Sequence, residues 1–67
     1  MDVGTRIKLR RKELKLTADQ LGERIGKDRS TIYRYENGEI ENMPISIIPV
    51  IAEALDISPI ELMGWKD

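Results

Sequence analysis

The 67-residue chain contains neither cysteine nor histidine. Without cysteine it can form no disulfide and no thiolate metal site, and without histidine it lacks imidazole ligands and the usual general base at neutral pH. No paired-carboxylate arrangement stands out in the sequence. We therefore expect no catalytic residue, no metal, no cofactor and no small-molecule substrate, and the composition argues against an enzyme.

A long apolar segment is also lacking. The chain opens with Met1 and has neither a basic-plus-apolar signal segment nor a run of about eighteen apolar residues. We therefore expect a cytoplasmic protein that makes no membrane contact. A chain of 67 residues has room for one hydrophobic core, which predicts a single domain over residues 1–67.

The charges are balanced overall but unevenly distributed. The net charge is −1, yet residues 1–35 carry ten Lys or Arg against five acidic residues, whereas residues 36–67 carry one Lys against seven acidic residues. Such asymmetry indicates one surface that attracts polyanions and another that does not. Two solvated faces of different charge would explain the same distribution equally well.

Apolar residues recur at helical spacing and predict an all-α chain. Thr17 with Gln20, and again Ser58 with Glu61, have the form of a capping box, which marks the start of a helix. Gly26 is expected to end the second helix in the left-handed conformation. The five helices are expected at about residues 3–14, 18–25, 29–36, 45–55 and 59–63.

Two residues within the expected helices need an explanation. Gly22 lies inside the second helix, where we expect its missing side chain to let another helix approach closely. Pro49 does not suit a helix interior. Either the fourth helix begins near Ser46, which places Pro49 in its first turn, or the helix is kinked at Pro49.

The helix expected over residues 29–36 has an unusual division of its faces. Only Ile32 and Tyr35 are expected to point inward. The opposite face is small, polar and basic, and consists of Arg29, Ser30, Tyr33 and Arg34. This face is typical of a surface that contacts a partner, although an ordinary solvated helix would also explain it.

The stretch from Ala18 to Asn37 combines several fixed spacings. The residues that carry the pattern are Leu21, Gly22, Gly26, Ile32 and Tyr35. This pattern resembles the helix-turn-helix of the lambda-repressor-like, Xre-type family. The flanking pieces agree with the family, namely Arg11 in the first helix and the runs IYRYENG, IAEAL and ISPIELMGW. The resemblance implies a compact five-helix DNA-binding domain whose second and third helices form the helix-turn-helix.

The resemblance also implies roles for individual residues, with the third helix lying in the major groove of double-stranded DNA. The positions that match base-reading residues are Arg29, Ser30 and Arg34, with Thr31 and Tyr33 at the margins. Those that match phosphate-binding positions are Thr17, the amide of Ala18, and Asn37, and charge and placement alone add Lys27 and Arg24. Arg11 and Glu36 match an internal salt bridge between the first and third helices. Because arginine binds guanine through two hydrogen bonds, we expect guanine in the half-site.

The function implied by the resemblance is sequence-specific transcription regulation, as in phage or bacterial repressors that bind a palindromic operator as a homodimer. Many relatives carry basic residues after the third helix, whereas this chain has Glu39, Ile40 and Glu41. We therefore expect weak phosphate contact on that side. The isolated domain would then be monomeric, or would bind DNA weakly unless dimerised.

A second hypothesis is a helical protein-interaction module, such as an antitoxin or adaptor, that binds its partner through the acidic C-terminal half and Trp65. Trp65 is expected either to cover the core or to contact another molecule. The run LMGW resembles the point at which phage and mobile-element repressors continue into a linker and a further domain. The chain is therefore either a small stand-alone regulator or the N-terminal part of a longer repressor.

Overall fold

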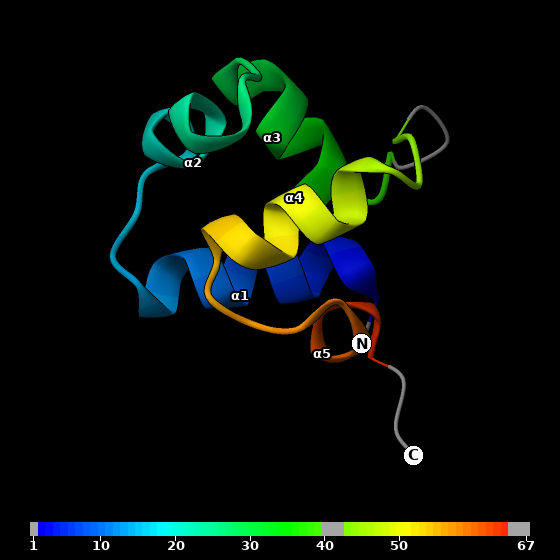
Figure 1. The fold of residues 1–67 in the computed structure, drawn as a ribbon. Helices are drawn as coiled ribbons and strands as arrows, with labels where there is room; N and C mark the ends of the chain where they lie inside the picture. The colour runs from blue at the N-terminus through cyan, green and yellow to red at the C-terminus, as the bar shows by residue number, and fades with distance from the viewer. Residues whose placement is uncertain (1, 40–42, 65–67) are drawn as a thin grey trace.

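The computed structural model describes residues 2–39 and 43–64, which form five helices and no strand. The helices are α1 (Val3–Glu13), α2 (Ala18–Ile25), α3 (Arg29–Glu36), α4 (Ile47–Ala54) and α5 (Pro59–Met63) (Figure 1). The predicted all-α, five-helix fold is therefore confirmed. The expectations for Ile40, Glu41 and Trp65 concern positions outside the described residues.

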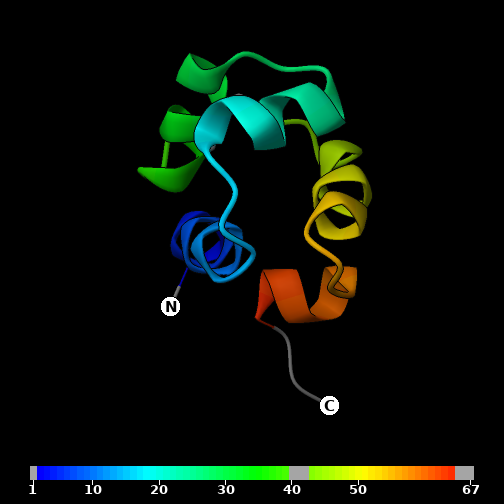
Figure 2. The same cartoon turned by 90° about the vertical axis from the view of Figure 1, so that its left-hand side faces the viewer.

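The helices surround one hydrophobic core. In the view of Figure 2, α1 and α3 lie on one side and α4 and α5 on the other, with α2 across the top. The largest fully buried side chains come from all five helices and from the C-cap of α4: Ile7, Leu21, Ile32, Ile51, Leu55 and Leu62. No helix in the described part of the chain is long and apolar enough to cross a membrane.

Local capping signals begin and end the helices as expected. At the start of α2, the amide of Gln20 donates to Thr17 Oγ1 over 3.1 Å and the amide of Thr17 donates to Gln20 Oε1 over 2.8 Å. Ser58 and Glu61 form the same capping box at α5. Gly26 ends α2 with a φ of 75°, in the left-handed region that glycine adopts most readily.

Helix α4 begins two residues later than the expected range of 45–55. It starts at Ile47, so Pro49 lies in its first turn, where the amide that proline lacks has no partner within the helix. Of the two alternatives for Pro49, the later start is therefore correct. Both α1 and α4 also end one residue before the expected position, with Leu14 and Leu55 as their C-caps.

Two glycines allow backbone segments to meet. A Cβ atom on Gly4 would collide with the carbonyl oxygens of Tyr35 and Glu36, so Gly4 lets α1 touch the end of α3. A Cβ on Gly22 would collide with the carbonyl oxygen of Lys27. The expectation for Gly22 was therefore wrong in its partner, because the close neighbour is the turn that follows α2 rather than another helix.

Candidate nucleic-acid interface

Helix α3 is placed by its buried face and by its N-cap. Ile32 is 1% exposed and Tyr35 is 5% exposed, so both belong to the core. At the N-terminal end, Asp28 Oδ1 accepts a hydrogen bond from the amide of Thr31 over 2.9 Å. Hydrogen bonds from Thr31, through its side chain and its amide, lower the pKa of Asp28 from its ordinary value. The helix is thereby held in one orientation with its other face outward.

The C-terminal end of α3 is joined to α1 by a buried ion pair. Arg11 Nε donates to Glu36 Oε2 over 2.6 Å, and Arg11 Nη2 donates to Glu36 Oε1 over 3.0 Å. The two side chains are 9% and 2% exposed. The hydrogen bond that Arg11 donates to Glu36 raises the pKa of Arg11. Glu36 therefore points inward together with Ile32 and Tyr35, which were the only inward residues expected.

The same arginine fixes the connection between α1 and α2. Arg11 Nη1 donates to the carbonyl oxygen of Leu16 over 2.9 Å. Three different segments, namely α1, the α1–α2 connection and the end of α3, thus meet at one guanidinium group. This arrangement matches the internal salt bridge that the sequence resemblance implied.

The outward face of α3 carries the residues expected to read bases. Arg29, Ser30 and Arg34 are all exposed, and Ser30 and Arg34 lie one helical turn apart. Tyr33 is half-exposed and lies on the flank of α3 toward Arg11 of α1. Thr31 is partly buried and lies on the opposite flank of α3, because two residues of a helix separate it from Tyr33 by about 200° around the helix axis.

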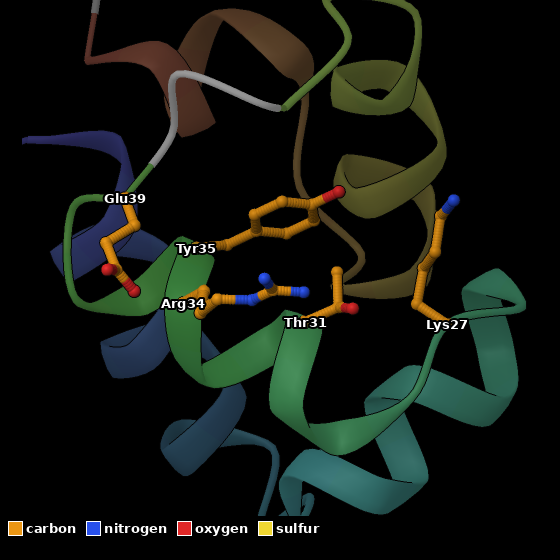
Figure 3. Close-up of a pocket in the computed structure, with 5 residues that line it drawn as sticks. All are labelled: Lys27, Thr31, Arg34, Tyr35 and Glu39. Carbon is orange, nitrogen blue, oxygen red and sulfur yellow. The ribbon is translucent and has the colours of Figure 1, made fainter.

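A groove of about 300 Å³ runs along that opposite flank. It is lined by Lys27, Thr31, Arg34, Tyr35 and Glu39. Figure 3 shows the guanidinium group of Arg34 lying back over Thr31, toward the N-terminal end of α3. Its charge contributes to the lowered pKa of Asp28 at that end. The guanidinium group of Arg34 thus extends toward the N-cap of α3.

Glu39 places an acidic side chain at the edge of this groove (Figure 3). Its amide donates to the carbonyl oxygen of Arg34 over 2.9 Å, which holds the residue directly after the end of α3. A carboxylate at this position opposes the positive charge of Lys27 and Arg34 in the same groove. The positive potential at this end of the groove is therefore reduced.

Most of the residues expected to contact phosphate lie at the start of α2, at the end of α3 or in the groove, and Arg24 is the exception. Thr17 and Asn37 are exposed at the N-cap of α2 and the C-cap of α3, and Lys27 is exposed in the groove. The side chain of Ala18 is buried, which leaves only its amide for a contact.

Arg24 does not lie with the others. Its Nη1 donates to the carbonyl oxygen of Ala54 over 3.2 Å, at the end of α4. Arg10 joins it there, because its Nε donates to the carbonyl oxygen of Leu55 over 2.8 Å. Helix α4 has no basic residue in its own last turn, so these two arginines supply the positive charge that its C-terminal carbonyl groups favour.

One contact of the outward face was not expected from the sequence. Arg29 Nη1 lies 3.8 Å from Oδ2 of Asp19, in the first turn of α2. No spacing rule for a single helix pairs these two residues, because they lie on different helices. The only signal in the sequence was the opposite charge of two residues near the starts of α2 and α3.

Residues 7–62 match the model of a protein family described as helix-turn-helix. A comparison of the sequence with curated proteins gives no match. Among solved structures, the P22 c2 repressor protein, in complex with synthetic operator 9T in the presence of Tl+, is similar to this chain. The TM-score is 0.87 and the sequence identity is 29%, over 98% of this chain and 98% of the repressor chain.

A second group of similar structures consists of chains about three times as long as this one. Hydroxypropylphosphonic acid epoxidase from S. wedmorenis matches with a TM-score of 0.84 and 26% identity over 91% of this chain. FeII HppE in complex with substrate gives the same TM-score and identity. The chain spans 32% and 34% of the length of these two chains. The likeness therefore concerns about a third of each longer chain.

Proposed function

The chain belongs to the helix-turn-helix family, and we propose that it is a transcription regulator that binds double-stranded operator DNA. The family match and the likeness to a repressor in complex with an operator support a DNA-binding regulator rather than an enzyme. The observation that carries the proposal is the outward face of α3, which is exposed, polar and basic while its inward face is fixed by Ile32, Tyr35 and the pair of Arg11 and Glu36.

In the proposed complex, α3 lies in the major groove and its outward side chains contact base edges. Arg29, Ser30 and Arg34 read the bases, and Thr31 and Tyr33 contact the margins of the site. An arginine that binds O6 and N7 of guanine contributes about 1–3 kcal/mol of discrimination. The two arginines therefore favour a half-site that contains guanine.

The contacts to the DNA backbone come from both sides of α3. Thr17 and the amide of Ala18 offer the N-terminal end of α2, where the helix dipole favours an anion. Asn37 and Lys27 supply the remaining phosphate contacts, whereas the side chain of Arg24 is directed to the carbonyl oxygen of Ala54. Glu39 repels phosphate at the edge of the groove, so one copy of the domain binds weakly.

A weak single domain favours binding in pairs. Two copies related by a two-fold axis present two α3 helices to two half-sites one helical turn of DNA apart, which corresponds to a palindromic operator. We therefore infer a dimeric repressor of the phage or bacterial type, acting in the cytoplasm.

A fluorescence anisotropy titration with a random-sequence duplex, at two salt concentrations, tests DNA binding directly. We expect binding at low salt that weakens steeply as salt is raised, because released counterions contribute to the affinity. The absence of binding at low salt would contradict the proposed DNA binding and would favour a protein-interaction module.

Selection from randomised duplexes tests the roles of individual residues. Arg34→Ala is expected to relax the base preference, whereas Asn37→Ala is expected to weaken binding to all sequences alike. Glu53→Gln, at an exposed position on α4, serves as the control and should leave the selected motif unchanged. If wild type and Arg34→Ala select the same motif, Arg34 does not read bases.

A further inference from the structure

Asp19, on α2, faces Arg29, the first residue of α3, across the turn of the helix-turn-helix. Its Oδ2 lies 3.8 Å from Nη1 of Arg29, and the two side chains are 62% and 68% exposed. An ion pair of this length between exposed groups contributes little to the stability of the fold. Its consequence lies instead in what the guanidinium group of Arg29 is free to contact.

A second carboxylate lies at the same end of α3. Asp28 is the N-cap, and its Oδ1 already accepts the hydrogen bond from the amide of Thr31. The N-terminal end of a helix ordinarily attracts phosphate through its free amides and its dipole. Here the carboxylate of Asp28 accepts the hydrogen bond of one of those amides. The two negative charges of Asp19 and Asp28 also repel a DNA phosphate from the N-terminal end of α3.

The negative charges of Asp19 and Asp28 affect what the guanidinium group of Arg29 binds on DNA. A guanidinium group without a partner binds any nearby phosphate, and phosphates are offered by every DNA sequence. A guanidinium group held by a carboxylate loses part of that attraction, whereas its hydrogen bonds to a guanine edge depend on geometry and still form. The pair with Asp19 therefore weakens the sequence-independent contact more than the base contact.

We propose that Asp19 is a specificity-determining residue that acts through Arg29, by keeping the guanidinium group off the DNA backbone and available to a base edge. This inference rests on the proposed function in DNA binding. Asp19 itself contacts no base and is a positioning residue. Its removal raises the affinity for all duplexes and lowers the preference for the cognate one.

The test measures the ratio of two dissociation constants by fluorescence anisotropy with the 67-residue chain. One duplex is the sequence selected by the wild type from a random library, and the other is a random-sequence duplex of equal length. Asp19→Asn is expected to tighten binding to the random duplex by about two- to fivefold, which is the range that an exposed ion pair supports. The dissociation constant for the selected duplex changes less. The ratio, defined as the dissociation constant for the random duplex divided by that for the selected duplex, therefore falls.

Three further comparisons separate this effect from a general change of charge. Glu23→Gln removes an exposed acidic residue one turn further along α2 and should shift both constants equally, which leaves the ratio unchanged. Asp19→Glu keeps the charge within reach of Arg29 and should preserve the ratio. In an Arg29→Gln background, Asp19→Asn should have no further effect on the ratio.

Two results would overturn the inference while the proposed function stands. One is a ratio that Asp19→Asn leaves unchanged or shifts only as much as Glu23→Gln does. The other is a fall in the ratio that persists in the Arg29→Gln background, since the effect would then not pass through Arg29. If the wild type binds neither duplex, the proposed function fails and the inference fails with it.

Discussion

The two ends of α3 are held by different kinds of interaction. At the C-terminal end, the buried pair of Arg11 and Glu36 and the close contact at Gly4 join the helix to α1. At the N-terminal end, the interactions are exposed: the cap from Asp28 to the amide of Thr31, and the ion pair of Arg29 with Asp19. One end of the helix is thus anchored in the core, and the other is stabilised at the surface.

The difference matches a division of labour along the helix. Buried, desolvated contacts tolerate little change, because losing one partner leaves the other without compensation. Exposed contacts exchange readily with solvent or with a ligand. The anchored end therefore sets the direction of α3, while the exposed end, which carries Arg29 and Ser30, can exchange its contacts for those of DNA.

Breaking the ion pair at the anchored end should have the largest effect. Glu36→Gln leaves the charge of Arg11 buried and poorly compensated, and we expect a loss of about 3–5 kcal/mol in the free energy of unfolding. Urea denaturation followed by circular dichroism measures it, with the exposed Glu39→Gln as control. Replacing both partners, Arg11→Met with Glu36→Leu, should recover much of the loss. A change in Glu36→Gln no larger than in the control would contradict the anchoring role.

Gly4→Ala should have the next largest effect. The added methyl group meets backbone carbonyl oxygens of Tyr35 and Glu36, which cannot rotate away, so α1 and α3 must separate. We expect a loss of about 1–3 kcal/mol, as for overpacking in a core. The same denaturation experiment checks it, with Lys8→Ala at an exposed position of α1 as the matched control. Equal stability of the two variants would show that the contact at Gly4 is dispensable.

At the exposed end, Asp28→Ala should destabilise the protein by less, and in a pH-dependent way. The pKa of Asp28 is lowered in the folded state, so its contribution is fully present above the ordinary pKa of the carboxyl group, near 3.8. The contribution is lost as the pH falls through the lowered value. The gap in melting temperature between wild type and Asp28→Ala should therefore be constant near neutral pH and narrow in acid. Asp28→Asn retains a capping group and serves as the control. If the difference in melting temperature between wild type and Asp28→Ala widens in acid, the capping role of the Asp28 carboxylate is refuted.

The smallest expected effect lies at the end of α1, beside the anchored pair. Lys15 has a φ of 58°, in the left-handed region that is costly for a residue with a side chain. Lys15→Gly relieves this cost but adds freedom to the unfolded chain, so we expect a net gain of about 0.5–1 kcal/mol. The midpoint of thermal unfolding measures it. Lys12→Gly, inside α1, is the control and should be destabilising.

Much of the fold was predictable because its signals are local. The capping box at Thr17 and the left-handed glycine at Gly26 each involve residues within one turn, so the sequence alone identifies them. The start of α4 was less certain, because Pro49 is compatible with two local solutions. The observed start at Ile47 places the proline where its missing amide costs least.

The contacts that could not be predicted join residues far apart in the chain. Gly4 meets the carbonyl groups at the end of α3, and the helical pattern of α1 contains no sign of that neighbour. Arg24 was expected to contact phosphate on the strength of its charge, yet it binds the carbonyl oxygen of Ala54. A charge count does not specify the direction of a side chain, which depends on the helix packed beside it.

The amino-acid sequence by itself determined the number and order of the helices, the capping boxes of α2 and α5 and the polar face of α3, because these depend on spacing within one or two turns. The family resemblance already implied the pair of Arg11 and Glu36, whereas only the tertiary structure decided that Arg29 pairs with Asp19 on the outward face. The pair of Arg11 and Glu36 lies within the core, whereas Asp19 and Arg29 meet at the surface. The physical reason is that burial and pairing are properties of neighbouring elements in space, which local spacing does not encode.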